Sequence, residues 1–478
     1  MSINWTVCCH ELKRKWHNQT LKLLFVLAQF LLALVLWNSW QQYQQSLVVQ
    51  QNAQTMVEEQ WLAQPDRHPH RVAHFGHFAF RPPGMLSFFD QGVNSWVGHS
   101  IFLEAHKQNS ANFSKDDNAE LLLRFSELSV ANTLLLIWPL LLIAMGFASL
   151  SGEKDSGTLR QLVSLGVSFR QLLVGKALAY LLLSLAFILP VFCATLLLAA
   201  FSEVGTDIQQ WWRCLLLLAV YLLYCLIWVA LILLCSVLSS TSRQSLSVLV
   251  TLWFVLTVLM PRVLADSAET LYPHLKRNDF TQTVKSEVRK TGNSHNPHDP
   301  HFNAFKERIL AQYGVTRVED LPVNYRGLVM QEGERITAEI YDRHYQAQLQ
   351  RFAQQQAFIG HFYWLNPYLA ARDLSMALSG TDSRHFFDFE QQAESHRYAR
   401  IQQLNKLHVE EVDYHDDRGQ RLSASYWQAF PAFHYAFPAL SWSLSGMGKA
   451  TLSALLLFGM LLILLWLPTV QRRSYVRV

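Results

Sequence analysis

Cysteine is scarce in this chain, with six residues in 478, and none lies in the two long polar segments at about 41–130 and 265–444. A disulfide framework is therefore excluded for both segments. Charged residues are also scarce, at 16%, where an average soluble protein has about 25%. The net charge of +4 comes from dispersed Lys and Arg, so we expect no nucleic acid among the partners.

Motifs for catalysis and nucleotide binding are missing as well. A phosphate-binding loop needs Gly-x-x-x-x-Gly-Lys-Ser/Thr, but the two Gly-Lys pairs, in "FRQLLVGKA" and "LSGMGKA", are followed by Ala. No nucleophile elbow, HExxH motif or carboxylate pair within an apolar run stands out. We therefore expect no catalytic residues, no cofactor in this chain and no enzyme activity of its own.

Long apolar runs are what the chain does have. It is 51% hydrophobic with a mean hydropathy of +0.10, which is too apolar for an ordinary soluble protein. A buried helix of a soluble domain explains one such run but not six, and no small-residue cleavage site follows the first. The six runs long enough to cross about 30 Å of hydrocarbon are Leu21–Trp40, Ala131–Leu150, Val174–Phe201, Cys214–Leu238, Ser245–Leu264 and Ala450–Pro468.

The positions of Lys and Arg in the short segments predict the orientation, because these residues favour the cytoplasmic side. They are Lys13, Arg14, Lys15, Lys22, Lys154, Arg160, Arg170, Lys176, Arg243, Arg472, Arg473 and Arg477. The link "SEVGTDIQQ" between the third and fourth runs has none. We therefore predict that both termini are cytoplasmic and both long polar segments are outside. Arg213 and Arg262 lie at the ends of spans, where we expect their side chains to extend to the membrane–water interface.

The chain then divides into eight parts. They are an interfacial amphipathic helix (1–20), transmembrane helix 1 (21–40), extracytoplasmic segment A (41–130), transmembrane helix 2 (131–150), a cytoplasmic segment (151–173), transmembrane helices 3 to 5 (174–264), extracytoplasmic segment B (265–444), and transmembrane helix 6 with a cytoplasmic tail (445–478). Segment A is too short to bury its scattered apolar residues, so we expect it to pack on segment B. Its beginning lacks Gly and Pro, which predicts that the first membrane helix continues until close to Pro65.

Before the first span, helical spacing predicts an interfacial helix. Trp5, Cys8, Leu12 and Trp16 recur at steps of three and four beside a basic run, a pattern typical of a helix that lies on the inner leaflet. A disordered basic leader is the alternative.

The segment "SGEKDSGTLRQLVSLGVSFRQLLVGK", Ser151–Lys176, is charged and punctuated by glycine. Ser156 or Thr158 can cap a short helix there, and Glu153 or Asp155 complements the helix dipole. The apolar stripe of that helix can rest on the membrane surface or on a partner protein. From its residues alone, the segment is an amphipathic intracellular loop.

A resemblance gives this loop a function. The pattern Glu-charged-x-x-Gly-Thr-Leu, Leu-x-x-Gly-Val-Ser-x-Arg and Gly-Lys resembles the coupling segment of ABC-2 type permeases. The matching positions are Glu153, Gly157, Thr158, Leu159, Val167, Ser168, Arg170, Gly175 and Lys176. The chain departs from the family at Gly166, where Pro is usual, and at Phe169, where Arg is frequent. Leu365–Arg397 and Tyr426–Pro438 are similar to a subfamily with large outside insertions, known as permeases of copper-enzyme-maturation type.

The resemblance implies an all-α membrane protein with six transmembrane helices of ABC-2 exporter type and a mostly α-helical extracytoplasmic domain. It implies a permease subunit in a bacterial inner membrane, paired as a homodimer or a heterodimer and coupled to a separate cytoplasmic ABC ATPase that holds ATP and Mg²⁺. Residues expected to couple to that ATPase are Glu153, Gly157, Thr158, Leu159, Ser168, Arg170 and Lys176. Substrate export or transfer is the expected function. The alternative is mechanical transmission that drives an extracytoplasmic chaperone or maturation function, with little or nothing crossing the membrane.

Histidine is the remaining candidate chemistry, because 17 of the 19 histidines lie in the two long polar segments. Two groups have short spacings, namely His68, His70, His74 and His77, and His295, His298 and His301. Imidazoles at such spacings can bind zinc or copper. No cysteine accompanies them and Pro interrupts both groups, so the sequence favours no metal site.

Overall fold

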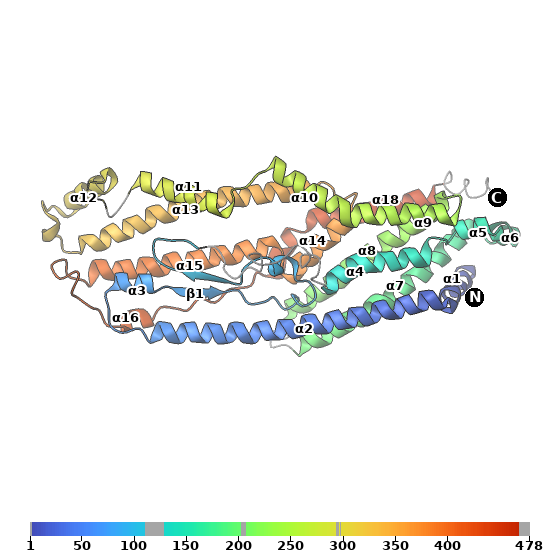
Figure 1. The fold of residues 1–478 in the computed structure, drawn as a ribbon, viewed down its shortest axis with the longest axis horizontal. Coiled ribbons are helices and arrows are strands. Elements are labelled where there is room, and N and C mark those ends of the chain that lie inside the picture. The colour runs from blue at the N-terminus through green and yellow to red at the C-terminus, as the bar shows by residue number, and fades with distance from the viewer. Residues whose placement is uncertain (1, 110–128, 202–206, 293–295, 297, 468–478) are drawn as a thin grey trace.

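The computed structural model describes residues 2–109, 129–201, 207–292, 296 and 298–467. Over these residues the protein is elongated and mostly helical (Figure 1). The N-terminal helix α1 (Ile3–His17) and the last helix α18 (Gly448–Trp466) lie in the same half of the molecule. A second group of helices extends away from that half. We call it the distal domain, and it comprises the described residues of 41–109 and 265–444.

Six helical segments of the described chain are long and apolar enough to span a membrane. They are α2 (Gln19–Leu62), α4 (Val130–Gly146) with α5 (Ser151–Asp155), α7 (Phe169–Ala200), α8 (Ile208–Leu238), α9 (Ser242–Phe254) continued through the π-helical turn η5 (Val255–Leu259) into α10 (Met260–Leu271), and α18. Each overlaps one of the six predicted spans. The prediction of an all-α, multi-pass membrane protein is confirmed.

Helix α8 lies at the centre of the membrane half, where it contacts α4, α7, α14 (Pro367–Ser379) and α18. Aromatic rings fill much of this core. Trp138 of α4 stacks on Phe187 of α7 with 4.2 Å between ring centroids. Gly146 lets α4 approach α8, because a Cβ there would lie 2.6 Å from Cγ2 of Ile232. Close packing of this kind fixes the helices relative to one another.

Helix α2 joins the two halves of the molecule. It runs without a break for 44 residues, about 66 Å at 1.5 Å per residue, which is roughly twice the hydrocarbon thickness of a membrane. The Asn18 side chain caps its beginning by accepting a hydrogen bond from the Leu21 amide, and it ends three residues before Pro65. Figure 1 shows α2 in blue along one side of the protein, from the end near α1 to α16 in the distal domain.

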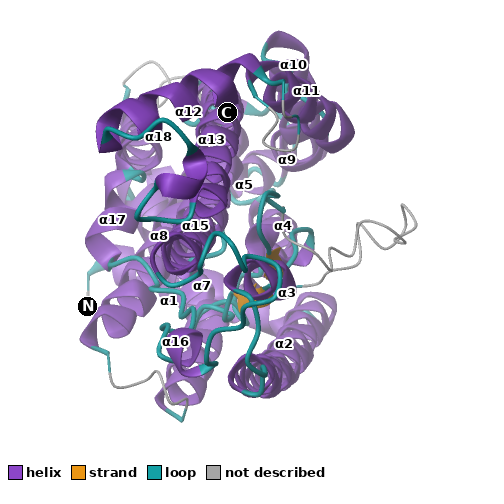
Figure 2. Ribbon diagram, turned by 90° about the vertical axis from the view of Figure 1, so that its left-hand side faces the viewer, coloured by secondary structure: helices purple, strands orange, loops and turns teal. Residues whose placement is uncertain are grey.

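The distal domain combines the two long polar segments. Its other elements are α3 (Pro69–Phe75), β1 (His77–Phe80), η1 (Gly92–Ser95), β2 (Ser100–Leu103), α11 (Arg277–Thr291), α12 (Pro300–Tyr313), η6 (Val318–Asp320), α13 (Tyr325–Gly360), α15 (Ser383–Glu410), α16 (Ser425–Gln428) and α17 (Leu440–Ser445). Helices α13 and α15 pack side by side. A view along the long axis (Figure 2) shows how little of the described chain is strand.

Apolar contacts hold the first polar segment on the second. Trp61 of α2 packs with Ile401 and Leu404 of α15 and with Trp427, and its indole N–H donates to the Trp427 carbonyl at 2.9 Å. The antiparallel pair β1–β2 places its buried face, including Ile101, on α15. The sequence did not indicate this pair, because strands of four residues are too short to show an alternating pattern.

The interpretation of Arg213 as a residue that reaches for the membrane interface is wrong. Its side chain is buried, with 1% exposed, at the start of α8. The guanidinium donates to the carbonyl of Leu378 at 3.1 Å and to that of Pro438 at 3.0 Å. A cation near the last carbonyls of α14 compensates the negative end of that helix. Arg213 therefore binds the base of the distal domain to α8.

Candidate functional site

Helices α5 and α6 (Thr158–Ser164) lie with α1 at the end of the molecule opposite the distal domain (Figure 1). The seven residues that the sequence singled out lie in these helices, at the N-caps of α6 and α7 (Gly157 and Ser168), and near the beginning of α7. Three of them join residues of α1 and Tyr180 in what we call the end cluster. It is defined by Glu11, Arg14, Lys15, Glu153, Thr158, Lys176 and Tyr180.

Glu153 faces inward and binds basic groups of its own chain. Its Oε1 atom lies 3.2 Å from Nζ of Lys176 and 3.4 Å from the Arg14 guanidinium. Its other oxygen accepts a hydrogen bond from the Thr158 hydroxyl. Only 13% of the Glu153 side chain is exposed. Three of the predicted coupling residues are therefore in direct contact, and their contact fixes α5 against α7 and α1.

Glu11 is the second acid of the end cluster, and sequence reasoning missed it. It accepts from Lys176 at 3.0 Å and from the Tyr180 hydroxyl at 2.8 Å, and it also pairs with Arg14 and Lys15. Burial by itself raises the pKa of this carboxyl, but the three positive charges and the Tyr180 hydrogen bond hold the pKa at about 2. The sequence did contain a signal for this residue, because Glu11 is the single acidic residue of the otherwise basic helix α1.

Helix α1 packs directly on α7. Gly175 makes this possible, because a Cβ there would lie 2.6 Å from Cβ of Val7 and 2.8 Å from the Asn4 carbonyl oxygen. Of the predicted apolar stripe, Cys8 is buried, whereas Trp5 and Trp16 are 43% and 51% exposed. One face of α1 therefore packs on the protein, and Trp5 and Trp16 lie on a part of the helix that remains half-exposed.

Two side chains of α5 bind the turn between α8 and α9. The Lys154 ammonium donates to the carbonyls of Val237 and Ser239 at the end of α8. The Asp155 carboxylate accepts from the amide of Ser242 at 2.7 Å and from its hydroxyl at 2.6 Å, at the beginning of α9. Because Glu153 binds α1 and α7, α5 is connected to four other helices.

The tip of α6 is the exposed part of this region. Gly157 and Gly166 flank it with φ of +73° and +85°, and a Cβ at either position would meet no atom within 4 Å. Left-handed backbone of this kind favours glycine. Leu159 is buried and anchors α6, whereas Leu165 is 78% exposed at its end. The turn thus presents an apolar side chain to the surroundings.

The expected cap of α6 by Ser156 or Thr158 is wrong. Gly157 occupies the N-cap position and no side chain caps the helix, because the Ser156 hydroxyl binds the Gly152 carbonyl and the Thr158 hydroxyl binds Glu153. Ser168 does cap α7, through a reciprocal pair of hydrogen bonds with Gln171. Arg170 lies over the ring of Trp466, 5.2 Å from its centroid, which connects α7 to α18.

The histidines that lie close together in the distal domain are not the groups that are adjacent in the sequence. His70 and His74 of α3 meet His106, which follows β2, and His68 meets His408 and Asp417. Burial, with smaller contributions from His74 and His106, lowers the pKa of His70 to about 3, so its ring is neutral at physiological pH. The second group with short spacings, His295, His298 and His301, does not assemble over the described residues. His295 lies outside them, His298 is exposed, and His301 binds Glu332 at 2.9 Å.

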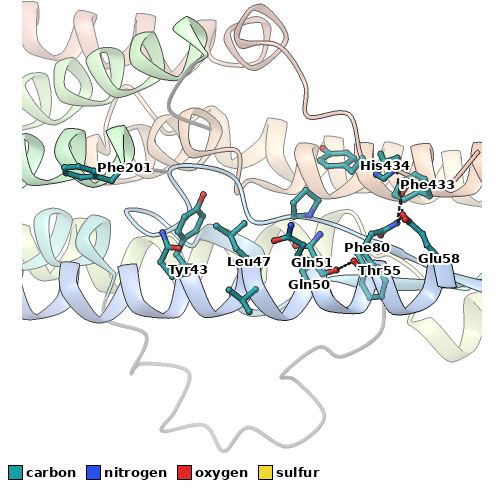
Figure 3. A pocket seen from close by; sticks show the side chains of 15 residues that line it. Tyr43, Leu47, Gln50, Gln51, Thr55, Glu58, Phe80, Phe201, Phe433 and His434 are labelled. Carbon is teal, nitrogen blue, oxygen red and sulfur yellow. Dashed lines mark hydrogen bonds and ion pairs between the residues drawn. The ribbon is translucent and has the colours of Figure 1, made fainter. Parts of the chain in front are cut away.

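A groove of about 630 Å³ lies between α2 and the chain that follows α16 (Figure 3). Gln51 of α2, Phe80 and Phe433 line it, with amide, hydroxyl and apolar groups elsewhere in its wall. Glu58 and His434 also line it, with a carboxylate oxygen of Glu58 3.9 Å from Nε2 of His434. These groups can bind an extended chain by hydrogen bonds, but they do not form a catalytic set.

The fold and the end cluster define a multi-pass, α-helical membrane subunit in which the segment after the second span is bound to the ends of four other helices. Residues 5–312 match the model of the ABC-2 family transporter proteins, and residues 279–436 match a domain of unknown function, DUF3526. Since the first match covers more than half of the chain, the protein belongs to the ABC-2 family transporter proteins. No curated protein matches the chain in a sequence comparison.

Proposed function

We propose that this chain is the permease subunit of an ABC transporter and that a separate cytoplasmic ATPase, which holds ATP and Mg²⁺, docks on α6. The connection of α5 to α1, α7, α8 and α9 is the observation that carries the proposal. A displacement of α6 by a partner reaches α5 directly and, through these contacts, reaches four helices together. A loop that served only as a connector would need none of these contacts.

The docking surface in this proposal is the exposed side of α6 with the turn that follows. Leu165 supplies an apolar anchor, and Arg160 and Gln161 are exposed beside it. Glu153 faces inward, so its role is to hold α5 and α6 in place rather than to pair with a basic group of the ATPase. Five other residues act in the same way, by fixing the position of the surface. They are Thr158, Leu159, Ser168, Arg170 and Lys176.

The orientation and assembly follow from the same proposal. The Lys and Arg bias puts α1, α6 and both termini in the cytoplasm of a bacterium and the distal domain outside its inner membrane. Two permease chains, identical or related, pair above two ATPases. ATP closes the ATPase pair, and the shift in population passes through the end cluster to the membrane helices, which favours export. We include in this proposal the subfamily that Leu365–Arg397 and Tyr426–Pro438 resemble, the permeases of copper-enzyme-maturation type.

Mechanical transmission to the distal domain is the second candidate, and α2 supports it. Asn18 alone separates α1 from α2, and α2 continues unbroken into the distal domain, where Trp61 packs on α15. A movement of α1 therefore has a continuous helical path to that domain. Substrate-dependent efflux in sealed vesicles that contain permease and ATPase separates the two functions, since mechanical transmission alone moves no substrate.

Affinity purification of the tagged chain from its native membranes tests the docking. We expect the chain to co-purify with an ATP-hydrolysing subunit and to hydrolyse no ATP when purified alone. Leu165→Asp places a charge in an apolar contact and should abolish co-purification. Leu275→Asp is the matched control, because Leu275 is also exposed, at 42%, but lies in the distal domain. Full association of Leu165→Asp with the ATPase would show that α6 is not the docking surface.

A further inference from the structure

Three histidines from separate elements converge at one place in the distal domain. His70 and His74 stand one turn apart on α3, and their Nε2 atoms are 3.2 Å apart. His106 lies in the turn after β2 and adds a third ring, with centroids 5.7 Å from His70 and 5.3 Å from His74. One nitrogen from each of the three rings lies within 4.8 Å of the others.

The spacing suits a tetrahedral metal centre. Zinc binds imidazole nitrogen at about 2.0–2.1 Å, so two nitrogens of a tetrahedral site are roughly 3.3–3.4 Å apart by geometry. The Nε2 atoms of His70 and His74 are already close to this separation. Two histidines at positions i and i+4 of a helix are a frequent pair of zinc ligands for the same reason.

Buried partners fix the orientation of His106. Its Nδ1 atom lies 3.3 Å from the Glu334 carboxylate, and its backbone amide donates to the same oxygen at 3.0 Å. Glu334 is fully buried and is held by Arg397 at 2.6 Å. The remaining ring nitrogen of His106, Nε2, is buried and has no hydrogen-bond partner. A carboxylate behind a histidine whose other nitrogen is free is the outer-shell arrangement that metal ligands use.

The backbone at His106 supports the same conclusion. Its φ of +60° is the single positive value of a non-glycine residue over the described chain. Left-handed backbone is costly for a residue with a Cβ, and here it accompanies a pair of contacts, from ring and amide, to one carboxylate oxygen. This costly backbone conformation occurs at His106, the residue that places the third imidazole beside His70 and His74.

We propose that His70, His74 and His106 form a binding site for a late first-row divalent cation, with Zn²⁺ as the type, and that Glu334 positions His106. Three imidazoles with no oxygen ligand disfavour Mg²⁺ and Ca²⁺. A tetrahedral ion bound by three nitrogens keeps a fourth position for water or for a donor atom of another molecule. His74 is exposed, so the ion reaches the site from solvent. The bound ion connects the first polar segment to α13 through Glu334.

The neighbouring group of His68, His408 and Asp417 differs, because its carboxylate already binds donors of the protein. Asp417 Oδ1 accepts from His408 at 2.7 Å and from Asn324 at 2.9 Å, and Oδ2 accepts from Arg326 at 3.0 Å. The charge and the oxygens of this carboxylate are thus already compensated by protein donors. This group is a polar network that holds α13 to α15, and a cation there would compete with these protein donors for the Asp417 oxygens.

Equilibrium dialysis and calorimetry on the purified full-length protein, stripped with a chelator, test the proposal. We expect one tightly bound Zn²⁺ per chain, no comparable binding of Mg²⁺, and a thermal midpoint that rises with Zn²⁺ concentration because the ion binds the folded state. Bound Co²⁺ should show the intense visible absorption of a tetrahedral site. The test needs neither ATPase nor transport, so its result is independent of the proposed function.

His74→Ala is the decisive variant, because this exposed side chain can be shortened without disturbing the core. It should weaken Zn²⁺ binding by about 100-fold or more, since loss of an outer-shell partner alone costs 10–100-fold. His434→Ala is the matched control, a 75% exposed histidine of the same domain, and it should bind Zn²⁺ as the wild type does. Equal binding by His74→Ala and wild type, or no stoichiometric Zn²⁺ in the wild type, would overturn the proposal.

Discussion

At the residue scale, Gly175 sets the distance between α1 and α7. The space that a side chain would need is occupied by Val7 and the Asn4 carbonyl. A glycine within a helix costs about 1 kcal/mol relative to alanine, so its presence in α7 has to be offset by the close packing it permits. Lys176, the next residue, then lies within reach of Glu11 and Glu153.

Gly175→Ala should therefore destabilise the protein. The added methyl group would lie well inside contact distance of Val7, and forcing an extra carbon into a packed contact costs roughly 1–3 kcal/mol, more than the gain in helix propensity. Gly459→Ala in α18 is the control, because its Cβ would meet nothing within 4 Å. Thermal unfolding in detergent should show a lower midpoint for Gly175→Ala alone. Equal midpoints would mean that α1 does not pack on α7.

Glu11→Gln should loosen α1. The substitution removes the negative charge between Lys176, Lys15 and Arg14, and loss of one partner of a buried ion pair costs about 3–5 kcal/mol. Protease cleavage within α1 is the measurement, with Glu58→Gln, an exposed glutamate at 38%, as the control. Rapid cleavage in both variants, or in neither, would contradict the role given to Glu11.

The stability contributed by Glu11 should fall as the pH is lowered, because the folded protein lowers the pKa of this carboxyl. The pKa of Glu11 is about 2 in the folded protein and 4.5 without its neighbours. The stabilisation is therefore complete above a pH of about 4.5–5.5 and is lost as the pH falls toward 2. Glu11→Gln should lack this part of the acid destabilisation.

At the scale of elements, α5 and α6 have different tasks. In the proposed mechanism, α6 with Leu165 presents the docking surface, and α5 passes the movement on to the other helices. Glu153 belongs to the second task, since both of its oxygens are engaged within the chain. Substitutions at Glu153 and at Leu165, 12 positions apart, should therefore affect the two tasks separately.

Glu153→Lys should uncouple the permease without removing the ATPase. A positive charge beside Lys176 and Arg14 replaces attraction by repulsion, which costs several kcal/mol where charges are brought together. Helix α5 should then detach from α1 and α7, so coupled transport falls while co-purification persists. Leu165→Asp should lose both, and Gln161→Ala neither. Loss of co-purification in Glu153→Lys would mean that docking itself depends on Glu153, and the separation of the two tasks would then be wrong.

The elements themselves could be predicted largely from the sequence, because the signals for them are local. Apolar length identified the spans, and the lack of Gly and Pro predicted that α2 continues to near Pro65. The meeting of His106 with His70 and His74 could not be predicted, because it depends on how the turn after β2 lies against α3 and α13. The inward direction of Glu153 was missed for the same reason, since Arg14 and Lys176 are distant in sequence.

At the scale of the whole molecule, the orientation in the membrane is a testable consequence of the proposal. After replacement of the native cysteines, Gln346→Cys in α13 should react with an impermeant thiol reagent in intact cells, whereas Ser164→Cys in α6 should react only after the membrane is opened. Both positions are exposed in the structure. Labelling of Ser164→Cys from outside would reverse the orientation and remove the cytoplasmic ATPase from α6.

The last prediction concerns the path from the end cluster to the distal domain. Asn52 is an exposed residue in the part of α2 that lies in the distal domain, and Asn52→Pro removes a backbone hydrogen bond and kinks the helix at a cost of about 3 kcal/mol. If α2 carries movement, ATP-dependent changes in the labelling rate of Gln346→Cys should shrink in Asn52→Pro. Association with the ATPase should persist, because α6 is untouched.

Asn52→Ala is the control, since it shortens the side chain but keeps the helix straight, and it should respond to ATP as the parent does. Vesicle efflux measured on the same two variants assigns the path to a function. Efflux that falls together with the distal response means that export requires the distal domain, because both depend on one rigid helix. Efflux that persists while the distal response disappears means that the membrane helices transport on their own. An unchanged distal response in Asn52→Pro would exclude α2 as the path. It would leave other helical connections to the distal domain, such as α14, which Arg213 binds to α8, and α10, which contacts α13.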